Sequence, residues 1–290
     1  MSLDSTDVHA VVPDEGTGAA RPVAAESAPS TRAERRAAAS GAESSSAVSS
    51  SGSGRRTDWR LGGRTVHPWR SQVLSVALFG IGLGVVLGGV LSLVLPGVLG
   101  EYAATGMLWL GMLVPIVWAF VRSRPAGLLR VRWLDILWGV ALGLLLRMVQ
   151  GWLAVAAGGS GTLPSYPSIG GSLPEGFVFA DVIAPVVIAP VLEEFFFHAV
   201  VLVSVYTLLR RPVGRLMAGI VAVIVSTALF VLMHSLTGAL PVDTVISLTL
   251  LGLVCGGLVM LTGRIWPAVL VHIVYNASFV VLALAGTYLG

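Results

Sequence analysis

Seven long apolar segments occupy most of the chain after residue 72, and they restrict the fold more than any other sequence feature. Each approaches or exceeds the roughly 20 residues that an α-helix needs to cross a bilayer. Because lipid offers no hydrogen-bond partners, the backbone must pair within each segment, which predicts helices. The sequence therefore predicts an all-α, polytopic transmembrane helix bundle. Its spans are expected at residues 72–97, 103–121, 134–157, 180–209, 214–236, 243–262 and 266–288.

The arginines of the loops predict how the bundle is oriented. Thirteen arginines lie within residues 55–70, just before the first span, or in the loops that follow the second, fourth and sixth spans, and the other loops hold none. Cytoplasmic loops of membrane proteins are enriched in basic residues, so the N-terminus is expected in the cytoplasm and the C-terminus outside. The arginines are interpreted as topology signals, and no nucleic-acid surface is expected. The sequence predicts a multi-pass protein of the cell (plasma) membrane.

The N-terminal region has the composition of a polar tail. Residues 1–70 hold 9 of the 18 basic and 8 of the 15 acidic residues, and Ser, Ala, Gly and Arg dominate toward residue 60. Such a segment cannot bury enough apolar surface to offset the entropy of ordering it. The predicted organisation is a disordered cytoplasmic tail at residues 1–65 and a transmembrane domain at residues 66–290.

Six ionisable side chains lie inside the predicted spans, where such groups are costly and usually mark function. They are Arg147, Glu193, Glu194, His198, His234 and His272. Asp135 and Asp243 lie at predicted helix ends, where they are expected to be solvated. The interior groups are therefore the candidates for a functional site.

Three pairs of side chains lie four residues apart, a spacing that places both members on one helix face. The pairs are Glu194 with His198, Phe230 with His234, and His272 with Asn276. Sites inside helix bundles are built in this way, from side chains on facing helices. Counting along the spans, however, puts His234 near the outer end, His272 in the inner third and Glu193 at the centre. A compact site then requires tilted, broken or staggered helices.

The two adjacent glutamates are expected to have different roles. Two neighbouring carboxylates in a low dielectric should not both be charged. Glu194 has His198 one helical turn away as a polar partner, whereas Glu193 has Phe197 at that position. We therefore assign Glu193 as the base and Glu194 as its structural and electrostatic support, and the exchanged assignment stays open.

A carboxylate, two imidazoles and an amide in a dry interior suit the hydrolysis of an amide bond. Glu193 can serve as general base for water, and His234 and His272 can orient that water or bind a metal. The Asn276 amide and a histidine N–H can donate to the developing oxyanion. Glu193, His234 and His272 with one open position also form a candidate catalytic zinc site.

The motifs "EEFFFH", "FVLMH" and "HIVYN", in this order on membrane helices, resemble the CPBP family of intramembrane metalloproteases. This family is also called the CAAX prenyl protease and bacteriocin-processing, or Abi, family. The resemblance covers about residues 180–280, and "TGRIWPAVLVHIVYNA" resembles the family's last motif especially well.

This resemblance implies a glutamate-dependent intramembrane endopeptidase in which Glu193 and His234 activate water. It also implies that His272 and Asn276 hold the oxyanion or a metal. Zinc or another divalent metal is one expectation and a metal-free mechanism is the other. The implied partners are the lipid bilayer and a membrane protein or lipidated peptide as substrate.

His198 departs from the family pattern, which usually has Arg at this position. A neutral imidazole is a poorer partner for Glu194 than a permanent positive charge. Arg147, at similar depth on the third span, is predicted to pair with the glutamates or else to reach a carbonyl.

Two alternative functions stay open at this point. One is a catalytically altered family member that acts as a binding or immunity partner. The other is a proton-coupled membrane transporter, because intramembrane Glu, His and Arg also suit a proton relay. The oligomeric state is not predicted by the sequence.

Overall fold

The computed structural model describes residues 58–61, 66, 68–168, 170–236 and 238–289. The chain divides into two compact units, residues 1–54 and 55–290. The first unit, and with it most of the predicted disordered tail, lies outside the described residues. The second unit contains every predicted membrane span.

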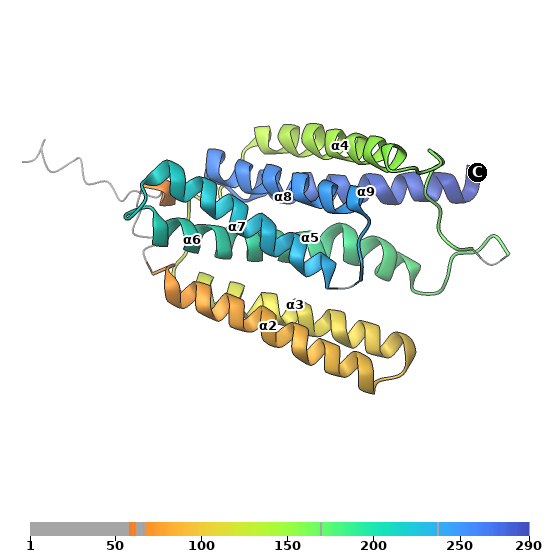
Figure 1. Cartoon of the computed structure of the whole chain (residues 1–290), viewed down its shortest axis with the longest axis horizontal. Helices are drawn as coiled ribbons and strands as arrows, with labels where there is room; N and C mark the ends of the chain where they lie inside the picture. Colours follow the sequence, from red (N-terminus) through yellow and green to blue (C-terminus); the bar gives the residue numbers. More distant parts are fainter. Residues whose placement is uncertain (1–57, 62–65, 67, 169, 237, 290) are drawn as a thin grey trace, which may run out of the picture. The chain divides into compact units, whose positions relative to one another are not determined.

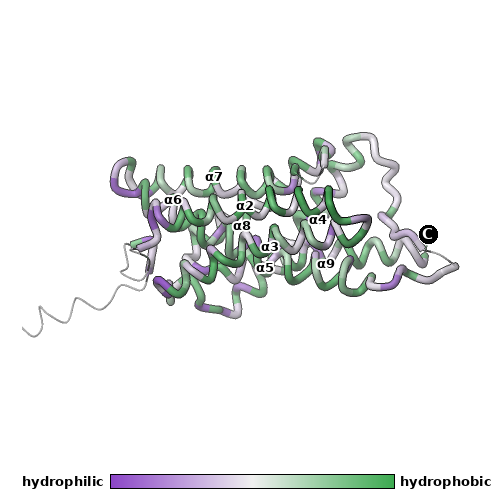
Figure 2. Tube along the Cα trace, turned by 90° about the horizontal axis from the view of Figure 1, so that it is seen from below, coloured by the Kyte–Doolittle hydropathy of each residue, from purple (hydrophilic) through white to green (hydrophobic). Residues whose placement is uncertain are grey.

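All seven predicted spans are helical, and the described residues contain no β-strand (Figure 1). Six of them are single α-helices, and the fourth span covers Val178–Leu209. The chain is thus a multi-pass membrane protein, and Figure 2 shows hydrophobic residues along its helices. The six are α2 (Ser71–Val94), α3 (Gly97–Arg122), α4 (Trp133–Ala156), α7 (Arg215–Ser235), α8 (Val242–Thr262) and α9 (Trp266–Leu289).

The fourth span alternates between π-helical and α-helical hydrogen bonding. Its four pieces are η3 (Val178–Ile188), α5 (Ala189–Glu193), η4 (Glu194–Val201) and α6 (Leu202–Leu209), of which η3 and η4 are π-helical. Pro185 and Pro190 lie in η3 and α5, and proline cannot donate the backbone hydrogen bond of a regular helix. Wide turns of this kind often accompany functional sites.

The fourth span is the centre of the described bundle. Its η4 segment contacts α2 and α3 as well as α7 and α8, and η3 contacts α9. Figure 1 shows the α2–α3 pair on one side of the fourth span and α4 on the other. Seven of the eight residues of η4 are buried, Glu194 and His198 among them. Glu194 and His198, whose exposure to lipid would cost free energy, are therefore covered by other helices.

Close packing of α2 on α3 depends on glycine. A Cβ atom added to Gly84 would lie 2.8 Å from the carbonyl oxygen of Met107, and one on Gly88 would lie 2.9 Å from that of Ala104. Small residues let membrane helices approach closely and pack by van der Waals contact. These glycines are thus used for packing within the chain.

The expectation that Asp135 is solvated is wrong. Asp135 is fully buried, and Arg264 donates to it from Nε, at 3.2 Å from each carboxylate oxygen, and from Nη2. The beginnings of α4 and α9 meet here, because the Ile265 N–H donates to the Leu128 carbonyl at 2.9 Å. The carboxylate is therefore compensated by a residue 129 positions away, not by water.

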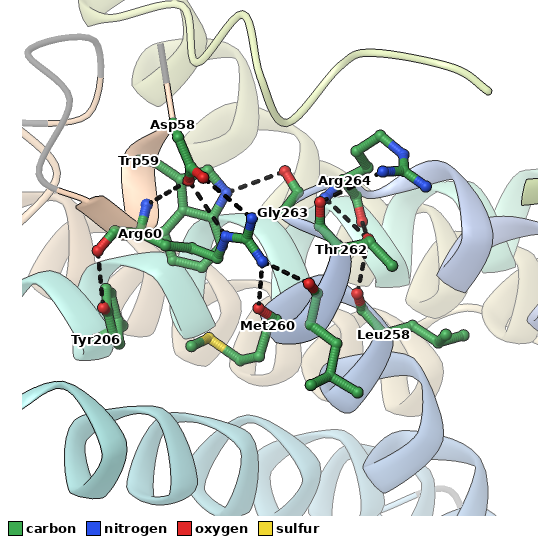
Figure 3. Close-up of polar contacts among 10 residues, drawn as sticks. Asp58, Trp59, Arg60, Tyr206, Leu258, Met260, Thr262, Gly263 and Arg264 are labelled. Carbon is green, nitrogen blue, oxygen red and sulfur yellow. Dashed lines mark hydrogen bonds and ion pairs between the residues drawn. The ribbon is translucent and has the colours of Figure 1, made fainter. Parts of the chain in front are cut away.

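A short helix, η1 (Trp59–Leu61), extends the membrane domain beyond the predicted boundary at residue 66. Trp59 is fully buried and its Nε1 donates to the Gly263 carbonyl at 3.1 Å. The Tyr206 hydroxyl donates to the Arg60 carbonyl at 2.9 Å (Figure 3). The structure therefore attaches η1 to α6 and to the end of α8.

Candidate active site

Glu193 faces two imidazoles that come from different helices. Its Oε2 atom lies 3.8 Å from Nε2 of His234 on α7 and 3.8 Å from Nε2 of His272 on α9. The Glu193 side chain keeps 15% of its surface exposed, whereas Glu194 is fully buried. Three spans thus bring the predicted base and both predicted histidines to one point.

Counting along the spans placed Glu193, His234 and His272 at different depths, and the staggered ends of the helices explain how they meet. Figure 1 shows that the turn joining α8 to α9 ends short of the turn joining α6 to α7. The first turns of α9, and His272 with them, therefore lie deeper in the bundle than counting from the loop predicts. The η1 helix occupies the end of α8, since Trp59 bonds to Gly263.

His272 lies between the two glutamates. Its Nδ1 is 2.9 Å from Oε1 of Glu194, and its Nε2 faces Glu193. A carboxylate accepts hydrogen bonds, so Nδ1 carries the proton of this pair. The second glutamate therefore fixes the orientation of the imidazole that faces the first, as a second layer of residues does in many catalytic sites.

His198 is held by a serine that the sequence analysis did not identify. The Ser226 hydroxyl on α7 donates to the Phe197 carbonyl at 2.9 Å and lies 2.7 Å from His198 Nδ1. Because the serine proton goes to the carbonyl, the serine oxygen accepts from Nδ1–H. Helical spacing could have identified this serine, because Ser226 precedes Phe230 by four residues and therefore lies on the same helix face.

The other nitrogen of His198 faces Glu194 without a hydrogen bond. Nε2 lies 3.9 Å from Glu194 Oε2, and neither atom has a hydrogen-bond partner among the described residues. A neutral ring protonated at Nδ1 has no second proton to donate. His198 is thus an anchored, fully buried group beside Glu194, at a position where Arg is usual in the family.

Ser226→Ala should lower the free energy of unfolding by about 1–3 kcal/mol, because His198 Nδ1 and the Phe197 carbonyl both lose a buried partner. The adjacent Thr227→Val is the matched control. Thr227 Oγ1 is buried without a hydrogen-bond partner, so its removal should leave stability equal or higher. Thermal unfolding in detergent compares the two variants, and equal losses would contradict the assigned contact.

Phe230, predicted as a supporting residue, packs against all three imidazoles. Its ring centre lies 4.5 Å from that of His234, 5.7 Å from that of His272 and 6.1 Å from that of His198. The Phe230 carbonyl also accepts a hydrogen bond from His234 Nδ1 at 2.9 Å. With Nδ1 bonded to this carbonyl, the His234 ring presents Nε2 toward Glu193.

Asn276 contacts the backbone of the fourth span. Its Nδ2 donates to the Pro185 carbonyl at 2.8 Å. In the π-helical register this carbonyl would pair with residue 190, which is proline and has no N–H. The amide predicted as an oxyanion donor thus replaces a missing backbone donor and fixes η3 against α9.

Of the two alternatives predicted for Arg147, the structure shows the contact with a carbonyl and not the pairing with the glutamates. Its guanidinium donates to the Tyr275 carbonyl at 2.7 Å and lies 4.0 Å from the centre of the Tyr275 ring. It also donates to Gln150 and to Ser278, and it forms no ion pair with a described carboxylate. A carbonyl and an aromatic face together hold the cation on the α4–α9 contact.

The metal set predicted from the sequence is not preformed. Glu193, His234 and His272 converge, but the side chains described by the structure include no group of three or more metal-binding residues placed to hold an ion. Zinc bonds of about 2.0–2.2 Å in a tetrahedron require ligand atoms closer together than 3.8 Å. The arrangement as it lies fits a water molecule better than a metal ion.

Glu193 and His234 line a small cavity that adjoins a larger groove. The cavity encloses about 100 Å³, and Leu108 and Met233 are part of both its wall and the wall of the groove. The groove, of about 480 Å³, is formed by α2, α3 and the end of α7, with Gly84, Gly88 and Ala104 among its lining residues. Apolar and small side chains thus connect the glutamate to the side of the bundle.

Comparison with known proteins gives a family for this region. Residues 175–278 match the family model described as "Type II CAAX prenyl endopeptidase Rce1-like". Comparison with curated proteins and with solved structures gave no match. The matched range contains all three motifs and the convergent residues from Glu193 to Asn276. Over this range the chain is similar to the CPBP/CAAX family of membrane proteases.

Proposed function

We propose that the protein is an intramembrane endopeptidase in which Glu193 activates the water that attacks a peptide bond. The observation that carries this proposal is the position of Glu193 Oε2, 3.8 Å from two imidazole nitrogens at the wall of a cavity. The match of residues 175–278 to the CAAX prenyl endopeptidase model supports the reaction class. The residue roles that follow are derived from the contacts of each group.

In this mechanism Glu193 takes a proton from water as the water oxygen bonds to the carbonyl carbon of the substrate. His234, anchored through Nδ1, orients the water with Nε2. The proton on Glu193 then passes to the amide nitrogen as the C–N bond breaks. The products are a carboxylic acid and an amine, so that one water is consumed for each bond cleaved.

Glu194 and His272 are assigned to the oxyanion that forms during this attack. A buried carboxylate bonded to Nδ1 stabilises a positive charge on the His272 ring, and the charged ring has a proton on Nε2 to donate. A donor prearranged in a dry site stabilises developing negative charge strongly. Asn276 is assigned a positioning role, because its amide holds the Pro185 carbonyl.

The groove beside the site favours a substrate held in the membrane. Its lining is mostly apolar, although it includes Glu101, and it shares Leu108 and Met233 with the cavity at Glu193. An extended peptide attached to a lipid chain or to a membrane span would fit this route. We therefore propose a membrane protein or a lipidated peptide as substrate.

The test is cleavage of a membrane-tethered peptide, with and without a prenyl group, by the full chain in liposomes. His234→Ala should lower the cleavage rate by about a hundredfold or more, since the water loses its orienting group. Ser235→Ala, an exposed neighbour on the same helix turn, should leave the rate unchanged. Each variant is compared at equal amounts of folded protein.

Four other outcomes of this assay are informative. Cleavage that survives His234→Ala would contradict the assigned mechanism, and loss on addition of a chelator would assign the water to a metal ion. Tight peptide binding without cleavage would favour a catalytically altered binding partner. Proton uptake that depends on Glu193, without cleavage, would favour a transporter.

A further inference from the structure

A second pocket lies at the end of the bundle where α4 and α9 begin and α8 ends. It encloses about 120 Å³. Its walls come from η1, from the loop before α4 and from the turn between α8 and α9 (Figure 3 shows part of this region). The lining residues are Asp58, Arg60, Gly127, Arg130, Arg132, Thr262, Gly263 and Arg264.

Two of the four arginines in this pocket are neutralised by other groups. Arg60 pairs with Asp58 at 3.0 Å and also donates to carbonyls at the end of α8, including that of Met260 at 3.1 Å. Burial raises the Asp58 pKa, but the hydrogen bonds and charge of Arg60 outweigh this effect and lower it, so that Asp58 stays ionised. Arg264 is paired with the buried Asp135.

The other two arginines have no compensating charge among the residues described by the structure. The side chains of Arg130 and Arg132 are exposed, and neither makes a hydrogen bond or an ion pair with any residue that the structure describes. The pocket therefore holds an excess of two positive charges, carried by guanidinium groups. Guanidinium presents several N–H donors in one plane and suits an anion with several oxygen atoms.

Helix geometry adds to the positive potential of this pocket. α4 begins at Trp133, directly after Arg132, and α9 begins at Trp266, two residues after Arg264. The N-terminus of a helix carries a partial positive charge and free N–H groups, and both favour anions. Asp135 offsets this effect in part at α4, and so does the end of α8, whose carbonyls carry the opposite partial charge. The two exposed arginines leave the pocket positive.

The pocket also lies at the level expected for lipid headgroups. It is formed at the ends of three membrane spans, and Trp133 beside it is 74% exposed. Tryptophan collects at the interface between lipid and water. A phosphate in this layer would therefore be within reach of Arg130 and Arg132.

We propose that this pocket binds an anionic phosphate group, held by Arg130 and Arg132 against the beginnings of α4 and α9. The group is supplied by a phospholipid headgroup or by soluble phosphate. The site is separate from the glutamate and histidine cluster, because none of its lining residues lines the cavity at Glu193. Its occupation would join η1, the loop before α4 and the α8–α9 turn.

The test titrates the purified full chain in detergent with three probes. These are inorganic phosphate, short-chain phosphatidic acid and short-chain phosphatidylcholine, and binding is measured by calorimetry and by the shift in thermal unfolding. The double variant Arg130→Gln/Arg132→Gln should bind phosphatidic acid at least about tenfold more weakly than the wild type. Its fold should persist, since Asp135 bonds to the backbone N–H of residue 132, which the substitution keeps.

The matched control is Arg211→Gln/Arg215→Gln, which removes two exposed arginines, one in the turn between α6 and α7 and the other at the first residue of α7. Its affinity should equal that of the wild type. Equal losses in the two double variants would overturn the pocket in favour of general charge attraction, and absence of binding by all three probes would also overturn it. Binding of phosphatidic acid that inorganic phosphate does not displace identifies a lipid headgroup, and displacement identifies phosphate itself as sufficient.

Discussion

Glu193→Gln should lower the rate of peptide cleavage by about a thousandfold, because an amide of the same size cannot take the proton of the attacking water. The fold should be kept, since Glu193 is partly exposed and its nearest imidazole nitrogens lie 3.8 Å away. The rate is measured in liposomes with a membrane-tethered peptide, and thermal unfolding in detergent checks the fold.

Two further variants test whether the loss of activity is specific to Glu193. Glu175→Gln makes the same change at an exposed position in the loop before the fourth span and should leave the rate unchanged. Glu194→Gln should retain more activity than Glu193→Gln, because in this assignment Glu194 acts only through His272. The reverse order of activity, at equal stability, would show that the two glutamates have exchanged roles.

The membrane spans were predictable from the sequence because lipid imposes a strong physical limit. A helix that crosses the hydrocarbon needs a minimum apolar length, so that the seven segments stand out without any knowledge of tertiary contacts. Helical spacing likewise predicted which side chains share a face. These two constraints and the motif order named Glu193, His234 and His272 as candidates, and the structure brings the three together.

The depth of each residue was not predictable, because counting from loop boundaries assumes that all turns reach the same level. The α8–α9 turn ends short, and its end is packed by Trp59 from a segment whose composition predicts disorder. The contact of Asn276 with Pro185 was hidden for a related reason. It depends on a π-helical register that no sequence pattern specifies.

The sequence also did not predict which groups compensate each buried charge. From charge alone, Arg147 was expected to pair with the glutamates or else to reach a carbonyl. In the structure its guanidinium contacts a carbonyl and the face of Tyr275. Conversely, Asp135 was expected to be solvated at a helix end, and Arg264 was interpreted only as a loop arginine that sets the membrane orientation. Carbonyls, aromatic faces and distant arginines all compensate buried charge, and only tertiary packing selects among them.

Asp135→Ala should lower the free energy of unfolding by about 3–5 kcal/mol, because it leaves the guanidinium of Arg264 buried without its partner. The Arg264 side chain is only 10% exposed and that of Asp135 is fully buried, so that water cannot replace the lost carboxylate. Asp58→Ala is the control, because the Asp58–Arg60 pair is about one-third exposed and such pairs contribute roughly 0–1 kcal/mol. Denaturant unfolding in detergent measures both losses.

The double variant Asp135→Ala/Arg264→Ala separates loss of charge compensation from loss of packing. It removes the uncompensated cation, so that it should be more stable than Asp135→Ala alone, and a further decrease would contradict the charge argument. Asp135→Ala should also bind phosphatidic acid more tightly than the wild type, because Arg264 lines the pocket and loses its neutralising partner. Since a ligand that binds only the folded state stabilises it, this lipid should restore part of the stability lost in Asp135→Ala and little in the double variant.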